Sequence, residues 1–194
     1  DYDDWAALGN DGWAHADVLP AFRRVEATPL GDAALRGRDG AVCVQSLRST
    51  HPLAAVFARA AQERGLRWND DYNGASQEGI AAPQVTQRRG WRCSAARGYL
   101  RPARGRPNLR IDTDAQVLRL TFDGRRCTGV EYRRGGETHR VRATAETIVC
   151  AGALGSPRLL MLSGLGPARE LQALGLDVRG DLPAVGANLC EHPE

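Results

Sequence analysis

The sequence predicts a mixed α/β fold, in which an antiparallel meander precedes one buried strand that leads into helices. Residues 116–122, 129–132 and 139–142 alternate between apolar and polar side chains, and Asp-Gly and Gly-Gly pairs separate them, which is typical of β-hairpins. Residues 109–112 predict a further short strand. Residues 147–152 form a continuous apolar run, which is typical of a strand buried on both faces in a parallel sheet.

Two segments in the first half have the pattern of amphipathic helices. Apolar residues recur at helical spacing in residues 17–26, where Asp17 is the expected N-cap. Residues 50–65 show a second apolar stripe, with Pro52 suited to the first helical position and Gly65 to the position just past the end. Local signals therefore predict where both helices begin and end.

The segment between these helices and the meander is polar. Residues 66–82 are rich in Asn, Asp and Gly and predict a loop. Residues 84–110 are rich in Arg, with a short helix expected at 94–100 that stops at Pro102. Clustered arginines with aromatic residues are also the footprint of a nucleic-acid-binding module, which remains a remote alternative. Because prolines and an apolar helix interrupt the cluster, we expect no nucleic acid partner.

The bulk composition excludes several classes of protein. The chain has 194 residues, 42% of them apolar, a net charge of +3 and no lysine. No apolar run approaches the roughly 20 residues that a membrane span needs. The five cysteines lack zinc-ligand spacing and are too few for a disulfide framework, which suggests a reducing compartment and a cytoplasmic protein with no metal site. An acidic start without Met suggests an internal piece of a longer protein.

Residues 151–166 carry the strongest chemical signal. Small residues after the apolar strand permit a tight turn, and Ser156 and Pro157 are suited to be the N-cap and first residue of a helix that closes at Gly164. A strand, a tight turn and a helix N-terminus form a corner that favours phosphate groups, and dinucleotides bind at such corners in open α/β sheets. A plain turn without a ligand is the alternative for this pattern.

The order of residues within 151–166 resembles the second signature of the GMC (glucose-methanol-choline) oxidoreductases. The resemblance extends over nearly the whole chain and is closest to the choline dehydrogenase-like bacterial branch. It is carried further by residues 1–5, 12–13, 70–74, 77–79, 92–95, 106–109 and 182–189. Glu191 departs from the family pattern, in which Asp is usual before the His at position 192.

The resemblance implies an FAD-dependent enzyme that oxidises the CH–OH group of an alcohol by hydride transfer to the flavin. Val117 matches the position whose backbone contacts adenine, and Ala151 with Gly152 matches the strand end near the ADP part of FAD. No catalytic residue is assigned, because the family's catalytic His lies beyond a chain of this extent, and His192 is interpreted as structural. The amino-terminal Gly-x-Gly-x-x-Gly turn is also absent, so we expect no turnover by the isolated chain.

The resemblance also implies parts of two domains: a partial Rossmann-like FAD-binding domain with its meander and part of the substrate-binding domain. Residues 1–30 are then a connecting segment over the cofactor, 31–107 part of the substrate-binding domain, 108–175 part of the FAD-binding domain, and 176–194 a return to the substrate side.

Several properties are left open by the sequence. A catalytically silent structural or interaction domain is the main alternative to an enzyme. A choline-like or other primary alcohol is the expected substrate class, whereas oxidase or dehydrogenase activity, peripheral membrane association and oligomeric state stay undecided. Apolar surface along residues 148–150 predicts poor solubility of the isolated chain.

Overall fold

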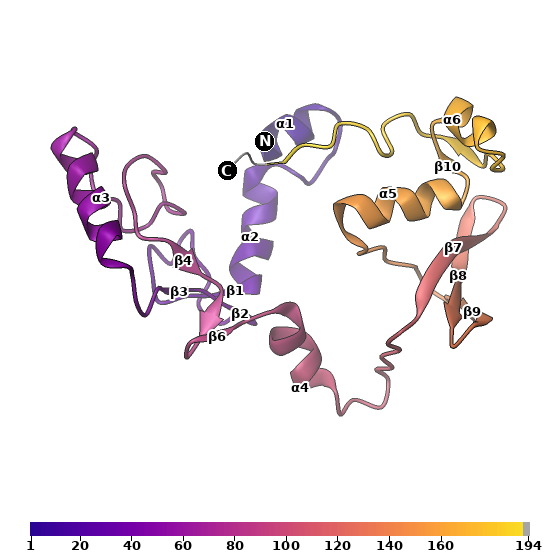
Figure 1. Cartoon of the computed structure of the whole chain (residues 1–194), viewed down its shortest axis with the longest axis horizontal. Helices are drawn as coiled ribbons and strands as arrows, with labels where there is room; N and C mark the ends of the chain where they lie inside the picture. Colours follow the sequence, from indigo (N-terminus) through magenta and orange to yellow (C-terminus); the bar gives the residue numbers. More distant parts are fainter. Residues whose placement is uncertain (192–194) are drawn as a thin grey trace. The chain divides into compact units, whose positions relative to one another are not determined.

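A computed structural model describes residues 1–191 of the chain (Figure 1). The chain divides into two compact units, Asp1–Leu109 and Arg110–Glu194. Both units mix helices and strands, so the α/β class expected from the sequence is confirmed. In the part of the chain that is described, no helix has the length and apolar character required to cross a bilayer.

The first unit opens with two helices, α1 (Tyr2–Ala7) and α2 (His15–Val25). The Tyr2 ring packs edge-on against Phe22, with 5.5 Å between ring centroids. The Asp3 carboxylate accepts a hydrogen bond from the His15 N–H at 2.8 Å. The expected N-cap was wrong, because Asp17 lies within the first turn of α2. A side chain from α1 satisfies the helix start instead, and no local pattern at Asp17 reveals that.

Helix α3 (Pro52–Glu63) follows the sequence prediction closely. The imidazole of His51 accepts the Leu53 N–H at 3.2 Å as an N-cap, and Gly65 has the positive φ of 93° that ends many helices. The expected apolar stripe is present, but it faces outward: the Phe57 side chain is 67% exposed. This stripe therefore contributes little burial within the described residues.

Three short strand pairs and loops complete the first unit, and each strand has only two residues. The parallel pair is β1 (Glu26–Ala27) with β2 (Val42–Cys43), and the antiparallel pairs are β3 (Gln45–Ser46) with β4 (Gln84–Val85) and β5 (Gln87–Arg88) with β6 (Trp91–Arg92). Residues 66–82 form the predicted loop, with a single bridge between Trp68 and Ile80. Ladders this short leave most of the cohesion to side chains.

A helical segment follows β6, and it runs further than expected. A π-helical turn, η1 (Ala96–Leu100), continues directly into α4 (Arg101–Ala103). Pro102 lies at the start of α4, where a missing N–H costs no helical hydrogen bond. The expectation that Pro102 ends the helix was therefore wrong by one residue or more.

The second unit is built on the predicted meander. Its strands are β7 (Gln116–Asp123), β8 (Arg126–Arg134) and β9 (Glu137–Arg142), antiparallel in that order (Figure 1). Gly124 begins the first hairpin turn with a φ of 54°, and Gly135 and Gly136 form the second with φ values of 58° and 87°. Positive φ at these positions matches the right-handed strand twist, so the turn residues explain the register.

Residues 109–112 do not form the expected strand. The Asp112 carboxylate instead pairs with Arg110 at 2.9 Å and with Arg134 of β8 at 3.2 Å. The segment is thus tied down by side chains rather than by a backbone ladder. An alternating pattern over only four residues does not distinguish a strand from an irregular segment that side chains hold in place.

The rest of the second unit packs helices against the meander. Its elements are α5 (Gly152–Leu162), β10 (Leu165–Gly166), α6 (Ala168–Ala173) and β11 (Gly180–Asp181), with β10 and β11 parallel. Leu171 of α6 is fully buried, with 0% of its surface exposed. The pairing of β11 with β10 joins the segment after residue 175 to this unit.

The expected buried strand at residues 147–152 is not formed, and this interpretation was wrong for the chain as it stands. The segment ends a connection from β9 to α5, and the Ile148 side chain is 76% exposed. A strand exists only through hydrogen bonds to a neighbour, and no described residue pairs with this segment. The apolar run indicates a tendency that needs a partner to become a strand.

Candidate cofactor-binding site

The N-terminus of α5 presents an open stretch of backbone. The helix begins at Gly152, with Ala151 as its N-cap, and both residues are exposed. Gly152 has a φ of 83°, and a Cβ built there would meet no atom within 4 Å. Its backbone can therefore be approached closely by another group, and the first-turn N–H groups of a helix are favourable partners for an anion.

The helix start differs from the sequence prediction in one respect. Ser156 and Pro157 lie inside α5 rather than at its N-cap and first position. The Ser156 hydroxyl accepts the N–H of Ala151 at 3.1 Å, so it still satisfies a backbone donor at this end. The prediction failed because the small residues before Ser156, assigned to the turn, already adopt helical geometry.

Val117 lies on β7, the outer strand of the meander, opposite Tyr132 of β8. Its side chain is 41% exposed. On the outer edge of the same strand, the N–H of Leu120 donates to the Ser163 hydroxyl at 2.9 Å, and that hydroxyl donates to the Leu159 carbonyl at 2.6 Å. Ser163 thus fastens β7 to the C-terminal end of α5.

The three residues predicted to contact the cofactor lie in one unit but not at one point. The contact of α5 with β7 is at the Ser163 end, whereas Ala151 and Gly152 are at the opposite end of an 11-residue helix, about 15 Å away by the helical rise. No hydrogen bond among the described residues joins Val117 to Ala151 or Gly152. An extended ligand rather than a compact one is needed to touch all three.

An apolar pocket begins immediately beside Gly152. Its volume is about 790 Å³, within the range of small-molecule sites. Helix α5 and residues 184–190 provide most of its walls, including Leu154, Met161, Val185 and Leu189. No local pattern in the sequence predicts this pocket, because residues 184–190 are separated from α5 by more than 20 positions.

The first unit contains a buried ionic network that spacing in the sequence does not reveal. The Arg36 side chain is only 3% exposed. Its guanidinium donates to the two carboxylate oxygens of Glu26 at 2.6 and 3.0 Å, to Asp71, and to the Gln84 amide oxygen at 3.0 Å. Gln84 also donates to Asp71 at 2.9 Å. The network anchors the loop that begins near Asp71 to strands β1 and β4.

The network shifts the pKa values of Glu26 and Arg36 toward their charged forms. Burial alone would raise the pKa of Glu26, but hydrogen bonds from Arg36 and from the Gly37 N–H outweigh burial and hold that pKa below its ordinary value. The Glu26 hydrogen bond raises the pKa of Arg36 in spite of its burial. The other oxygen of Asp71 is buried without a hydrogen-bond partner. Two carboxylates therefore flank one cation, which suits an anchor better than an acid–base pair.

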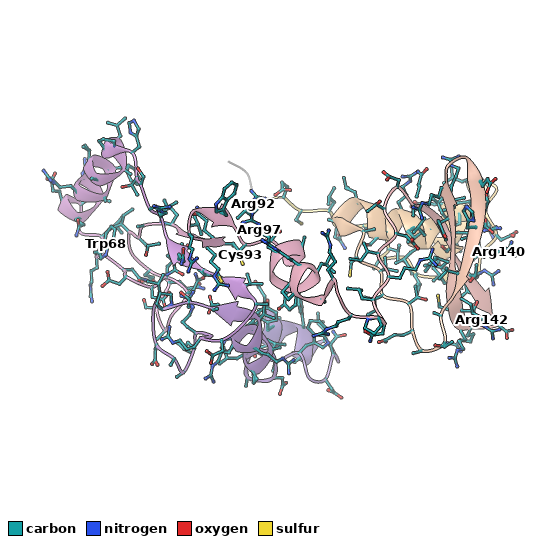
Figure 2. All side chains as sticks on the ribbon, turned by 90° about the horizontal axis from the view of Figure 1, so that it is seen from below. Trp68, Arg92, Cys93, Arg97, Arg140 and Arg142 are labelled. Atoms are coloured by element: carbon teal, nitrogen blue, oxygen red, sulfur yellow. The ribbon has the colours of Figure 1, made fainter. Side chains whose placement is uncertain are left out.

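The arginine-rich stretch folds around a second pocket, of about 440 Å³. Figure 2 shows Arg92, Cys93 and Arg97 close together on this part of the first unit. The Arg97 guanidinium lies over the Trp91 ring, 5.1 Å from its centroid. Such a contact places one arginine and one aromatic side chain against each other rather than presenting both to a nucleic acid base.

The histidines do not assemble into a catalytic group. His51 caps α3, and His139 stacks on Tyr132 with 5.3 Å between ring centroids. His192, which the sequence suggested as structural, lies outside the described residues. Over residues 1–191 the structure holds no cluster of His, Cys, Asp and Glu side chains suited to a metal ion.

Comparison with known proteins agrees with this architecture. The family model described as GMC oxidoreductase matches residues 1–194. An oxygen-dependent choline dehydrogenase of Sinorhizobium medicae is 46% identical over the whole chain, which spans 35% of that protein. An FAD-dependent oxidoreductase from Chaetomium thermophilum matches 94% of the chain and 34% of its own at 33% identity, with a TM-score of 0.86. Pyridoxine 4-oxidase from Mesorbium loti matches 94% and 37% at 32% identity, with a TM-score of 0.84. The chain belongs to the GMC oxidoreductase family.

Proposed function

We propose that this chain serves an FAD-dependent oxidation of an alcohol CH–OH group to the carbonyl. The observation that carries the proposal is the match of the whole chain, residues 1–194, to the GMC oxidoreductase model. The substrate class is a choline-like or other primary alcohol, supported by the similarity to a protein named as a choline dehydrogenase. The similarity to a pyridoxine 4-oxidase supports the wider class of primary alcohols.

The geometry of the second unit fits contacts to the nucleotide half of FAD. Ala151 and Gly152 offer exposed backbone with open space, and Val117 lies on the outer strand of the meander. The proposed contacts are from the Val117 backbone to the adenine and from the α5 N-terminus to the ADP part. The distance between the two contacts suits an extended dinucleotide.

When bound, FAD supplies the hydride acceptor that protein side chains lack. The part of this chain in the reaction is to hold the nucleotide through Val117 and residues 151–152. The buried Arg36 fixes the loop of residues 66–82 through Asp71, and residues 70–74 of this loop carry part of the resemblance to the family. No side chain of the described residues is assigned as the acceptor of the hydroxyl proton.

The cofactor contact is tested in the full-length gene product by a bulky residue at the exposed Ala151. Ala151→Trp should lower the flavin-to-protein ratio about tenfold, because its side chain would occupy the space proposed for the nucleotide. Ala173→Trp, at an exposed position in α6, is the matched control and should keep the wild-type flavin content. Equal flavin content in both variants would refute the proposed contact.

The activity is tested by the absorbance of bound flavin. Anaerobic addition of choline or of other primary alcohols should bleach the flavin band, because hydride transfer reduces the ring. Secondary alcohols and a quaternary ammonium compound without a hydroxyl group are the controls. A bound flavin that none of the alcohols bleaches would contradict the proposed reaction.

A further inference from the structure

Two cysteines that lie 50 positions apart in the sequence meet beside the arginine-lined pocket. Cys43 ends β2, and Cys93 follows β6. The backbone N–H of Cys43 donates to the Cys93 sulfur at 3.2 Å, and the Cys93 thiol donates to the Ala41 carbonyl at 3.5 Å. The Cys93 N–H is held in turn by the Thr86 carbonyl at 2.9 Å. The Cys93 sulfur is thus fixed against the backbone of its partner residue.

The two thiols differ in access, although both border the 440 Å³ pocket. Cys93 is buried, with 6% of its surface exposed, whereas Cys43 is partly exposed. Both are free cysteines. A small oxidant that enters the pocket would therefore reach Cys43 first and find Cys93 next to it.

The contact meets one requirement of a disulfide, which is that the two residues are neighbours. Disulfides join residues whose Cα atoms are about 4.4–6.8 Å apart, so the two backbones must already be neighbours. The sulfur of Cys93 already contacts the Cys43 backbone nitrogen, and rotation about the Cys43 Cα–Cβ bond can bring the second sulfur to it. Burial, and then the hydrogen bond with the Cys93 thiol, raises the pKa of the Cys43 thiol, while the Arg88 charge acts in the opposite direction. The reactive thiolate is therefore the minor form, and oxidation should become faster as the pH rises.

We propose that Cys43 and Cys93 form a redox-sensitive pair that a peroxide converts into a disulfide. The Cys43 thiol loses its proton, and its thiolate attacks one oxygen of hydrogen peroxide. The O–O bond breaks, Cys43 sulfenic acid forms, and the departing hydroxide takes up the proton as one water. The Cys93 thiol then attacks the sulfenic sulfur, which forms the S–S bond and releases a second water. Two thiols are oxidised and one peroxide is reduced, and the step does not depend on the flavin reaction.

The bond would fasten two parts of the first unit that are otherwise joined weakly. Strand β2 pairs with β1 over only two residues, and β6 pairs with β5 over two. A disulfide that closes a loop of this length restricts the unfolded chain strongly. Oxidation should therefore raise the melting temperature of the protein by several degrees, and a reducing agent should reverse the rise.

The test is peptide mapping of the full-length gene product after treatment with one equivalent of hydrogen peroxide. Trypsin should release residues 39–48 and 93–97 as two separate thiol peptides before oxidation and as one cross-linked pair afterwards. Dithiothreitol should separate the pair again. If both peptides keep free thiols while the exposed Cys150 and Cys190 are oxidised, the proposal is wrong.

Two variants sharpen the result. In Cys43→Ser the rise in melting temperature on oxidation should disappear, because the residual Cys93 thiol has no partner. The triple variant Cys127→Ser, Cys150→Ser and Cys190→Ser should keep both the cross-link and the rise. A rise that persists in Cys43→Ser would show that another group causes it, and the peptide map of the unmodified protein does not depend on how either variant folds.

Discussion

Each of the two units of this chain is stabilised internally by a different kind of interaction. The first unit has strands of only two residues. Among its described residues, the most buried charged side chain is that of Arg36, which two carboxylates and an amide hold in place. The second unit has a three-stranded ladder, the fully buried Leu171 and the Ser163 link between sheet and helix. The first unit therefore depends mainly on directional polar contacts, whereas the second depends mainly on apolar burial and backbone pairing, with one ionic contact of Glu131 to Arg119 and Arg140.

This difference has consequences for what a substitution does. Removal of one partner from a buried ionic network leaves the others charged and unpaired, which costs more than the net value of the pair. Removal of a buried apolar group costs its transfer free energy plus that of the cavity. The first unit should thus be most sensitive to the loss of a charge and the second to the loss of side-chain volume, while each unit holds one carboxylate with a lowered pKa, Glu26 and Glu131.

The largest effect is expected from Arg36→Ala in the first unit. Loss of the guanidinium leaves Glu26 and Asp71 as partly buried carboxylates without a cation, which should lower the free energy of unfolding by up to about 3–5 kcal/mol. Denaturant unfolding followed by tryptophan fluorescence reports on this unit, because all four tryptophans of the chain lie there. Arg64→Ala, at the exposed end of α3, should change it by less than about 1 kcal/mol. Similar losses of stability in Arg36→Ala and Arg64→Ala would show that the first unit does not depend on the Arg36 network.

Leu171→Ala should produce the next largest effect, confined to the second unit. The side chain is fully buried, so its truncation should cost about 2–4 kcal/mol. Amide hydrogen exchange in β7 and β8 should accelerate, while tryptophan fluorescence of the first unit stays unchanged. Leu174→Ala removes the same atoms from an exposed position and should have little effect. Faster exchange in the first unit as well would show that the units do not unfold separately.

Elements with complete local signals were predicted from the sequence. Helix α3 has Pro52 at its start and Gly65 beyond its end, and the meander has an Asp-Gly and a Gly-Gly pair at its two hairpin turns. These signals depend only on residues that are adjacent in the sequence, so the elements can be predicted from the sequence alone. The strand expected at 147–152 failed because strand formation depends on a partner, which the local pattern cannot supply.

The candidate sites were even harder to predict from local sequence patterns than the strands. Val117, Ala151 and Gly152 came from resemblance to a family, not from periodicity, and their role in cofactor binding stays a prediction. The Arg36 network joins residues 10, 35 and 48 positions apart, and the cysteine pair spans 50. Each cysteine taken alone has the character of a small buried apolar residue. Only the fold brings these side chains together.

Ser163→Ala should have a moderate effect, because it removes a buried hydrogen-bond acceptor. The Leu120 N–H would then be buried without a partner, at a cost of about 1–3 kcal/mol. Hydrogen exchange at the Leu120 amide is the direct measurement and should become faster. Ser156→Ala is the control, because the Ala151 N–H that it frees is exposed and can bond water. Equal destabilisation by the two variants would mean that burial does not determine how much such a hydrogen bond contributes to stability.

The smallest effect expected in the first unit is a dependence of its stability on pH. The pKa of Glu26 is lower in the folded state than its ordinary value, so the folded state favours the ionised form. The resulting stability is fully present above the unfolded pKa of about 4.3 and is lost as the pH falls through the folded pKa. The free energy of unfolding, followed by tryptophan fluorescence, should therefore decrease steadily below about pH 5. Glu26→Gln should make this decrease with pH less steep. Glu63→Gln, at the exposed end of α3, should keep it. An unchanged slope in Glu26→Gln would assign the acid sensitivity to carboxylates outside the Arg36 network, and the first unit would then lose its charge-based distinction from the second.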